Sequence, residues 1–242
     1  MMFTCYYDAS GTEGDPTRPL VVAGLASTAK RWVRFDREWE KALIDFGVPY
    51  LQMRKLARFE KPFDSWDEAK RDVFLSRLIP ILKRSVHKVF IMKITPTDFW
   101  AVAQLYDMSR AGNPYPIAAG TCIGIAQHWI QKKYPGCPIR HVLEKGDNSQ
   151  ELFDTLIRLE GITPFIEPKQ DPITSKWFSP FQGGDLLAFE YRQVFRDEQP
   201  YMPTASMQTI LRTIPQESYA HTQDTLTAMC RDHPDVFPPK IH

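Results

Sequence analysis

The feature of the sequence that most constrains its fold is the run Leu20–Ala26, in which every residue except one glycine is apolar. Such a run is typical of a strand that is buried on both faces. Residues 3–9 precede it and alternate, with Phe3, Cys5 and Tyr7 on one face. A segment rich in glycine and polar residues separates the two stretches, so together they predict a β-hairpin inside a sheet that helices cover.

The patterns after this hairpin alternate between helices and strands, which predicts an α/β fold: a mixed β-sheet of about five strands flanked by α-helices. We expect residues 1–198 to form this domain, with a helical insertion at about 30–85. Residues 199–242 are expected to form a helical C-terminal extension packed on the same domain. The other segments expected to be regular are helices at 32–46, 65–82, 100–105, 116–134, 149–160, 207–211 and 218–230 and from 179 onwards, and strands at 86–94, 139–144 and 163–167.

Composition excludes several classes of protein. The chain has 242 residues, of which 43% are hydrophobic, enough for one sizeable core. No apolar run reaches about 18 residues and the N-terminal residues turn polar too early for a signal peptide, so we expect no membrane segment and a cytoplasmic protein. The four cysteines are widely spaced and form no C-x-x-C motif, which disfavours a disulfide framework or a zinc knuckle.

The charge is distributed unevenly along the chain. The formal net charge is +1, yet residues 30–93 contain 16 Lys and Arg against 9 Asp and Glu, a local surplus of +7. A basic region of this kind is expected where a phosphate backbone lies against one face of a protein. Solvated basic helices give the same pattern, so charge alone does not decide between the two interpretations.

The stretch Ser179–Glu190 predicts the start of a helix. Ser179 suits the N-cap, Pro180 suits the first helical position, and Gln182 completes a capping box. Asp185 shares a face with Gln182 near the positive end of the helix dipole. Two glycines lie between Gln182 and Asp185, which indicates that a strand or a ligand approaches the helix closely. The alternative is that the glycines serve packing alone and that Asp185 only interacts with the dipole.

Three carboxylates are placed where they could meet. Asp8 ends the first strand, Glu144 ends the strand at 139–144, and Asp185 begins a nearby helix. Active sites of α/β sheets form at strand ends. Carboxylates that converge repel each other unless a cation neutralises them, and their hard oxygen atoms suit Mg²⁺ or Mn²⁺. Two such ions could activate a water for attack on a phosphodiester.

Four motifs carry a resemblance that spans almost the whole chain. They are Tyr-Tyr-Asp-Ala-Ser-Gly at 6–11, Val-Val-Ala-Gly-Leu at 21–25, Leu-Glu-Lys-Gly-Asp at 143–147 and Phe-Gln-Gly-Gly-Asp-Leu-Leu-Ala at 181–188. Together they resemble the domain of unknown function 3800 family, which is similar to the ribonuclease H-like superfamily and, in the layout of its acids, to Holliday-junction resolvases. The resemblance implies a ribonuclease H-like sheet, metal binding by Asp8, Glu144 and Asp185, and a homodimer by analogy with resolvases.

Two positions depart from the family pattern. Ala9 stands where the family usually has Glu, and Leu51-Gln52-Met53 replaces a segment that often contains His. Because neighbouring residues of a strand point to opposite faces, the loss of a Glu next to Asp8 need not remove a metal ligand. Gln182, at a position where a resolvase-like helix often has a third acid or a His, lowers the negative charge of the site.

The leading hypothesis is therefore a divalent-metal-dependent nuclease that hydrolyses DNA or RNA, with Asp8, Glu144 and Asp185 as catalytic metal ligands. Four further residues are expected to contact the substrate or support the ligands: Gln182, Lys145, Ser10 and Asp147. The rival is an inactive ribonuclease H-like module of a mobile-element or defence system that binds nucleic acid or protein. The rival is favoured if the three acids lie apart or pair with Lys or Arg. No G-x-S-x-G, P-loop or H-E-x-x-H motif supports another hydrolase or transferase class.

Overall fold

The computed structural model describes residues 1–11, 18–145, 161–195 and 205–240. Within these ranges the chain forms one six-stranded sheet with the order β5-β4-β1-β2-β3-β6. The strands are β1 (Phe3–Ser10), β2 (Leu20–Thr28), β3 (Lys88–Ile94), β4 (Ile139–Glu144), β5 (Phe165–Glu167) and β6 (Gln216–His221).

The sheet is mixed in direction. The strands β1, β2 and β3 form an antiparallel meander, with Tyr7 opposite Gly24 and Gly24 opposite Phe90. On the other side of β1 the strands β4 and β5 are parallel to it and to each other. The strand β6 adds to β3 in the parallel direction. The carboxyl ends of β1, β4 and β5 therefore lie at the same edge of the sheet.

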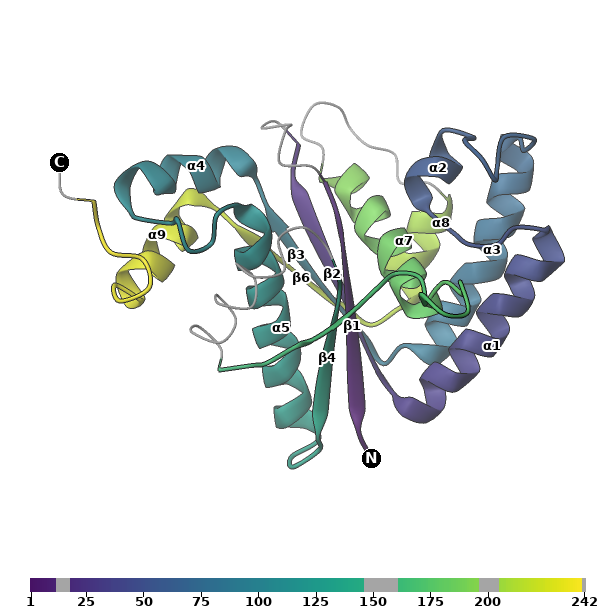
Figure 1. Cartoon of the computed structure of the whole chain (residues 1–242), viewed down its shortest axis with the longest axis horizontal. Coiled ribbons are helices and arrows are strands. Elements are labelled where there is room, and N and C mark those ends of the chain that lie inside the picture. Colours follow the sequence, from purple (N-terminus) through teal and green to yellow (C-terminus); the bar gives the residue numbers. More distant parts are fainter. Residues whose placement is uncertain (12–17, 146–160, 196–204, 241–242) are drawn as a thin grey trace.

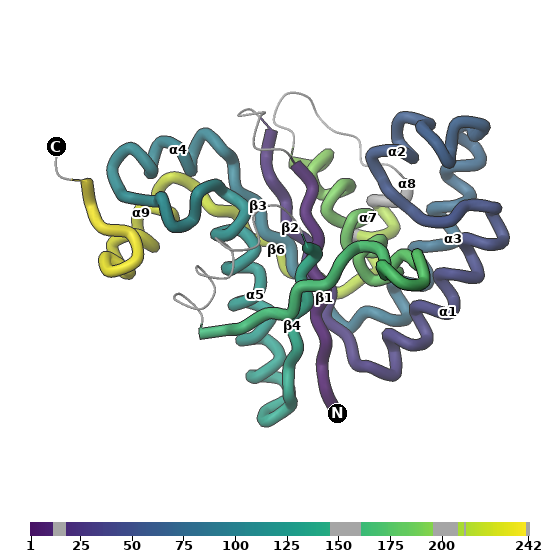
Figure 2. Tube along the Cα trace, viewed as in Figure 1, coloured from purple at the N-terminus to yellow at the C-terminus, as the bar shows by residue number. Residues whose placement is uncertain are grey.

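Helices cover both faces of the sheet (Figures 1 and 2). One layer packs α7 on β1 and β2, with α1, α2, α3 and α8 outside it, and the other packs α5 on β2 and β3, with α4 and α9 beyond. The helices of the first layer are α1 (Ala29–Phe46), α2 (Met53–Ala57), α3 (Glu68–Ser85), α7 (Ser179–Val194) and α8 (Ala205–Thr213). Those of the second are α4 (Pro96–Leu105), α5 (Pro114–Lys133) and α9 (Gln223–Asp232).

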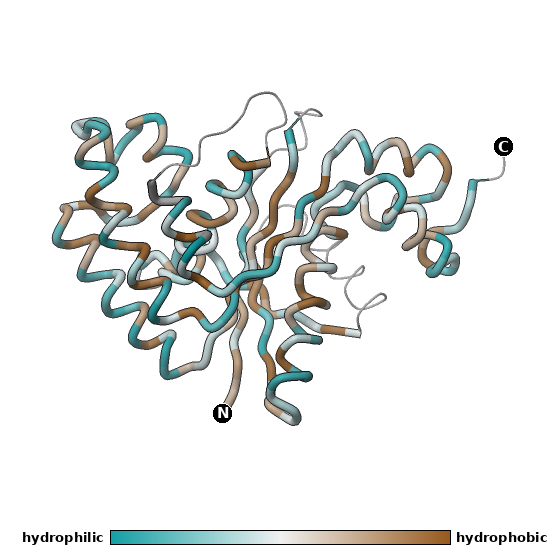
Figure 3. Tube along the Cα trace, turned by 180° about the vertical axis from the view of Figure 1, so that it is seen from behind, coloured by the Kyte–Doolittle hydropathy of each residue, from teal (hydrophilic) through white to brown (hydrophobic). Residues whose placement is uncertain are grey.

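The core consists of two apolar clusters, one on each face of the sheet. The first includes Phe35, Trp39 and Leu186, and the second includes Phe3, Phe90 and Ile123. Both form because β2 is buried along almost its whole length, as its apolar run requires. Figure 3 shows hydrophobic residues along the central strands, and hydrophobic residues that alternate with hydrophilic ones along the helices.

The predicted α/β class is confirmed, and most strands begin and end within a few residues of the expected positions. The structure corrects the first residues of the helix expected at 218–230 in the C-terminal extension. Residues 216–221 form the edge strand β6, so the sheet has six strands rather than about five. The helix expected at 149–160 lies outside the described residues. Among the helices that are described, none has the length and apolar character needed to span a membrane.

Candidate active site

Two of the predicted acids meet where parallel strands end. Tyr7 of β1 lies opposite Leu143 of β4, so the next residues, Asp8 and Glu144, lie side by side. Glu144 in turn lies opposite Glu167 of β5. Asp8 is 5% exposed, whereas the Glu144 side chain is 27% exposed and reaches the surface of the site.

The third acid is brought in by α7, which crosses β1 at close range. A Cβ added to Gly184 would lie 2.8 Å from the Cβ of Asp8, so only glycine permits this approach. This contact is the close approach that the paired glycines predicted. The next residue, Asp185, accepts a hydrogen bond from the backbone N–H of Met53 at the start of α2 through its Oδ2. The acids from β1, β4 and α7 therefore converge.

The start of α7 differs from the sequence-based prediction. Ser179 lies inside the helix rather than at its N-cap, which is Phe178, and no side chain caps the helix. The Ser179 hydroxyl instead donates a hydrogen bond of 2.7 Å to Oδ1 of Asp36 on α1. The capping-box prediction was wrong because a tertiary partner took the hydroxyl that would have capped the helix.

A lysine that the sequence analysis did not single out lies between two of the acids. The Nζ atom of Lys169, two residues after β5, donates to Oδ2 of Asp8 at 3.2 Å and to Oε2 of Glu144 at 3.0 Å. The Lys169 side chain is 19% exposed, so the two ion pairs are largely shielded from water. Lys169 thus neutralises part of the negative charge that the acids bring together.

The protonation equilibria of these groups are shifted by burial and by one another. Burial raises the pKa of Asp8 well above its usual value; the Lys169 ammonium opposes this rise, and the carboxylates of Asp185 and Glu144 add to it. Burial also raises the pKa of Asp185, against the effect of Lys169 and of the Met53 N–H. Burial lowers the pKa of Lys169, but the three carboxylates outweigh burial and hold it above its usual value. A second cation would therefore stabilise the ionised carboxylates further.

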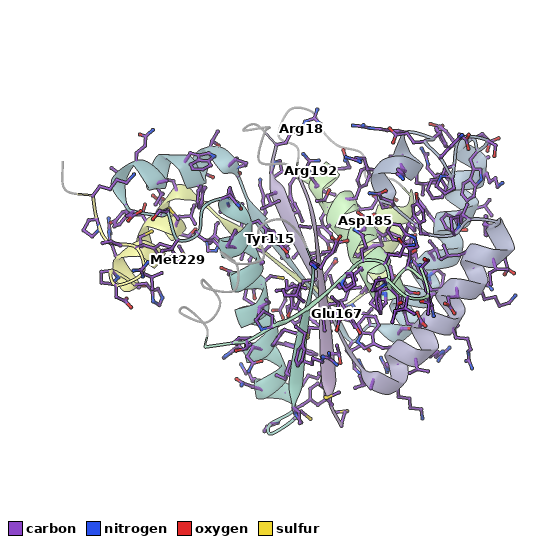
Figure 4. All side chains as sticks on the ribbon, in the orientation of Figure 1. Arg18, Tyr115, Glu167, Asp185, Arg192 and Met229 are labelled. Atoms are coloured by element: carbon purple, nitrogen blue, oxygen red, sulfur yellow. The ribbon has the colours of Figure 1, made fainter. Side chains whose placement is uncertain are left out.

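The three acids line one cavity of about 370 Å³. Basic side chains from four parts of the chain surround them: Arg18 beside β2, Arg54 and Arg58 at α2, Lys169, and Arg192 on α7. In Figure 4, Arg18 and Arg192 lie at the top of the view, above Asp185. A mainly acidic floor with a basic rim is suited to a ligand that carries phosphate groups.

Of the other predicted site residues that the structure describes, one lines the cavity and two do not. Ser10 lines the cavity. Gln182 does not: its side chain is 0% exposed, and its Oε1 accepts hydrogen bonds from Trp39 Nε1 and from the Leu51 N–H. Lys145 is exposed and is not among the described residues that line the cavity. Asp147 lies outside the described residues.

Sequence reasoning missed Lys169 and the arginines of the rim. Lys169 follows a strand that is parallel and adjacent to β4, so the strand-end argument that selected Asp8 and Glu144 applies to it as well. Arg54 and Arg58 stand four residues apart in a charged segment whose short helix, α2, has too few residues to show a periodic pattern. The hydrogen bond from Met53 to Asp185 ties this segment to the site.

The donor set fits a hard divalent cation in its chemistry, since all three acids supply oxygen and share one cavity. In this structure, however, the three acids are not positioned as the ligands of one metal ion. In the described part of the chain, no group of three or more His, Cys, Asp or Glu side chains is arranged to hold a metal ion. Lys169 occupies the oxygen atoms of Asp8 and Glu144 that face each other. If all three acids are ionised, the cluster with Lys169 has a formal charge of −2, which one divalent ion would balance.

The fold and the site define a class: an α/β protein with a mixed six-stranded sheet and a carboxylate cluster at the carboxyl ends of parallel strands. A chain of the PCNA:RNase HII complex from Archaeoglobus fulgidus is similar, with a TM-score of 0.43, 15% identity and 87% of each chain covered. Ribonuclease H2 from Pyrococcus horikoshii OT3 is similar with a TM-score of 0.40 and 12% identity, over 87% of this chain and 85% of that one.

Comparisons of sequence are negative. No family model matches the chain. No curated protein matches it either. Membership of the domain of unknown function 3800 family therefore stays a prediction, and the roles of individual residues depend on the geometry of this chain.

Proposed function

We propose that the protein is a divalent-metal-dependent nuclease that hydrolyses phosphodiester bonds of nucleic acid in the cavity between β1, β4 and α7. The observation that carries the proposal is the convergence of Asp8, Glu144 and Asp185 under a rim of basic side chains. Acids that repel one another in a buried place need a compensating reason to be there, and metal binding is one.

Each part of the site has a task in this proposal. Asp8, Glu144 and Asp185 would hold Mg²⁺ or Mn²⁺, and the bound cation would activate a water and stabilise negative charge on the phosphodiester. Arg54 and Arg58 would bind phosphate groups, for which guanidinium geometry is suited. The Met53 N–H fixes the orientation of the Asp185 carboxylate through Oδ2.

One observation favours a second function. Lys169 pairs with both Asp8 and Glu144, which is what an inactive, binding-only module would show if an internal cation had replaced the metal. In that case the basic rim would still bind a phosphate backbone, and the carboxylates would serve only to position Lys169.

The test is cleavage of labelled single-stranded, duplex and branched DNA and RNA in Mg²⁺ and in Mn²⁺. We expect the wild type to cleave at least one substrate only with metal, and Asp185→Asn to lower the rate by at least about 100-fold. Asp224→Asn, which changes an exposed acid on α9, is the matched control and should cleave as the wild type does.

Binding without metal-dependent cleavage, equal in the wild type and Asp185→Asn, would overturn the nuclease proposal. That result would favour the binding module. Cleavage that Asp185→Asn leaves intact would place the reaction elsewhere on the molecule.

A further inference from the structure

Lys169 forms ion pairs with two acids of the carboxylate cluster. Its Nζ lies 3.2 Å from Oδ2 of Asp8 and 3.0 Å from Oε2 of Glu144, so one ammonium bridges both acids. Both acids line the same cavity as Lys169 itself. The ammonium thus lies between the two oxygen atoms that the strand ends present to each other.

Two further oxygen atoms of the acids have partners from the backbone. Oδ1 of Asp8 accepts a hydrogen bond of 2.8 Å from the N–H of Ala9, and Oδ2 of Asp185 accepts one from Met53. Oδ2 of Asp8 is therefore the atom of that carboxylate on which Lys169 and a metal ion would compete. An ammonium and a divalent cation in contact with the same oxygens would also repel each other.

The backbone around Lys169 is held in place. The Lys169 carbonyl accepts a hydrogen bond of 3.0 Å from the Phe178 N–H, and Gln170 forms a bridge with Trp177. Trp177 stacks on Tyr50 at 4.2 Å between ring centroids. The lysine can therefore leave the acids by rotation of its flexible side chain, into the adjoining cavity, without movement of the loop.

We propose that Lys169 is a resident counter-ion of the Asp8–Glu144 pair, and that a divalent cation binds the site only by displacing it, so that this lysine sets the metal affinity. The inference rests on the proposed function in that it assigns the metal to the same acids. It adds a residue whose role is opposite to that of a ligand: removal of Lys169 strengthens metal binding.

The experiment compares Mn²⁺ binding to the wild type, Lys169→Met and Lys176→Met by titration calorimetry. Methionine keeps most of the length of lysine and removes its charge. Lys176 belongs to the same loop but pairs with Asp36 and Glu40 of α1, so it is the matched control. We expect Lys169→Met to bind Mn²⁺ about tenfold or more tightly than the wild type, and Lys176→Met to bind as the wild type does.

Two further measurements cover a loss of folding. Lys169→Arg keeps the charge and should bind Mn²⁺ no more tightly than the wild type. If Lys169→Met is unfolded without metal, Mn²⁺ should restore its circular dichroism spectrum at concentrations that saturate the wild type. Failure of Mn²⁺ to restore the fold at those concentrations would overturn the proposal.

Equal or weaker Mn²⁺ binding by Lys169→Met would also overturn it. If the wild type still shows metal-dependent cleavage in that case, only the role of Lys169 is wrong and the nuclease proposal stands. If Lys169→Met binds Mn²⁺ more tightly but the wild type cleaves no substrate, the counter-ion role is supported and the nuclease proposal is rejected. Absence of Mn²⁺ binding in both proteins rejects both proposals.

Discussion

Two adjacent residues of β1, Tyr7 and Asp8, bury polar groups on opposite faces of the sheet in different ways. On the α5 side the Tyr7 hydroxyl pairs with Nδ1 of His141 at 2.8 Å, and Nε2 of His141 pairs with Oε1 of Gln127 at 2.9 Å. On the α7 side Asp8 pairs with Lys169. The first network is composed of neutral groups inside an apolar cluster, and the second is composed of charged groups at a cavity.

Burial alone does not account for this difference, since Tyr7 is 0% exposed and Asp8 is 5% exposed. Burial raises the pKa of Tyr7 well above its usual value and lowers that of His141 to about 4, so both side chains are neutral at pH 7. Neutral partners satisfy each other within the core. A buried carboxylate needs cations, and the cations must come from the chain or from outside it. The contrast therefore places the buried charges, and with them the proposed metal site, on the α7 side.

The largest effect on stability is expected from Lys169→Met. The change leaves Asp8 and Glu144 close together without their shared cation, which should lower the free energy of unfolding by about 3–5 kcal/mol. The measurement is urea unfolding at pH 7 without metal. Adding Asp8→Asn to Lys169→Met removes one of the two unpaired acids and should recover much of the loss; a double variant as unstable as the single one would show that packing of the lysine stem, and not charge, was lost.

A smaller effect, dependent on pH, is expected from the neutral network. His141 has a folded pKa of about 4, depressed from 6.5 by burial. A depressed pKa means that its contribution is complete above the unfolded value and is lost as the pH falls through the folded value. Between pH 7 and pH 4 the wild type should lose about 2–3 kcal/mol that His141→Gln does not lose.

Urea unfolding of both proteins across that range isolates the His141 share, because other titrating groups are common to the two. Parallel stability curves for the wild type and His141→Gln would mean that His141 titrates normally and that the network is open to water.

The smallest effects are expected at two glycines, one on each side of β1. A Cβ at Gly24 would lie 2.5 Å from Cε1 of Tyr7, and one at Gly184 would lie 2.8 Å from the Cβ of Asp8. Gly24→Ala should cost about 1–3 kcal/mol through overpacking. Gly184→Ala should cost less, since alanine gains about 1 kcal/mol of helix propensity in α7.

The effects of the two variants on cleavage should have the opposite order to their effects on stability. Gly184→Ala displaces Asp8 and should slow metal-dependent cleavage, whereas folded Gly24→Ala should cleave at the wild-type rate, measured at a temperature where both are folded. Equal cleavage by the two variants would mean that the position of Asp8 is not critical.

Much of the sheet could be predicted because its inner strands are patterned. The strands β1 to β4 carry alternation, β-branched residues or a continuous apolar run, all of which depend on local sequence. The edge strand β6 has the sequence Gln-Glu-Ser-Tyr-Ala-His and shows no apolar face. Only its pairing with β3 makes it a strand, and that pairing has no local signal.

The site could be predicted only in part for a similar reason. Asp8 and Glu144 follow recognisable strands, and the glycines before Asp185 announce a close contact. Lys169 stands in a polar loop, where a lysine is usually solvated, and its importance arises from the register of β4 and β5. Gln182 was expected at the site because of its helical face, but Trp39 and Leu51 engage its side chain instead.

The position of β6 has a consequence for synthesis of the protein on the ribosome. Val89 of β3 pairs with Gln216 of β6, which is made more than a hundred residues later. At about 5–20 residues per second, the outer edge of β3 waits on the order of ten seconds for its partner. During that interval an apolar strand presents unpaired N–H and C=O groups to other chains. Less frequent initiation of translation leaves fewer nascent chains with this edge exposed at the same time. The yield of folded protein should therefore rise when initiation is less frequent, and when a chaperone covers the edge.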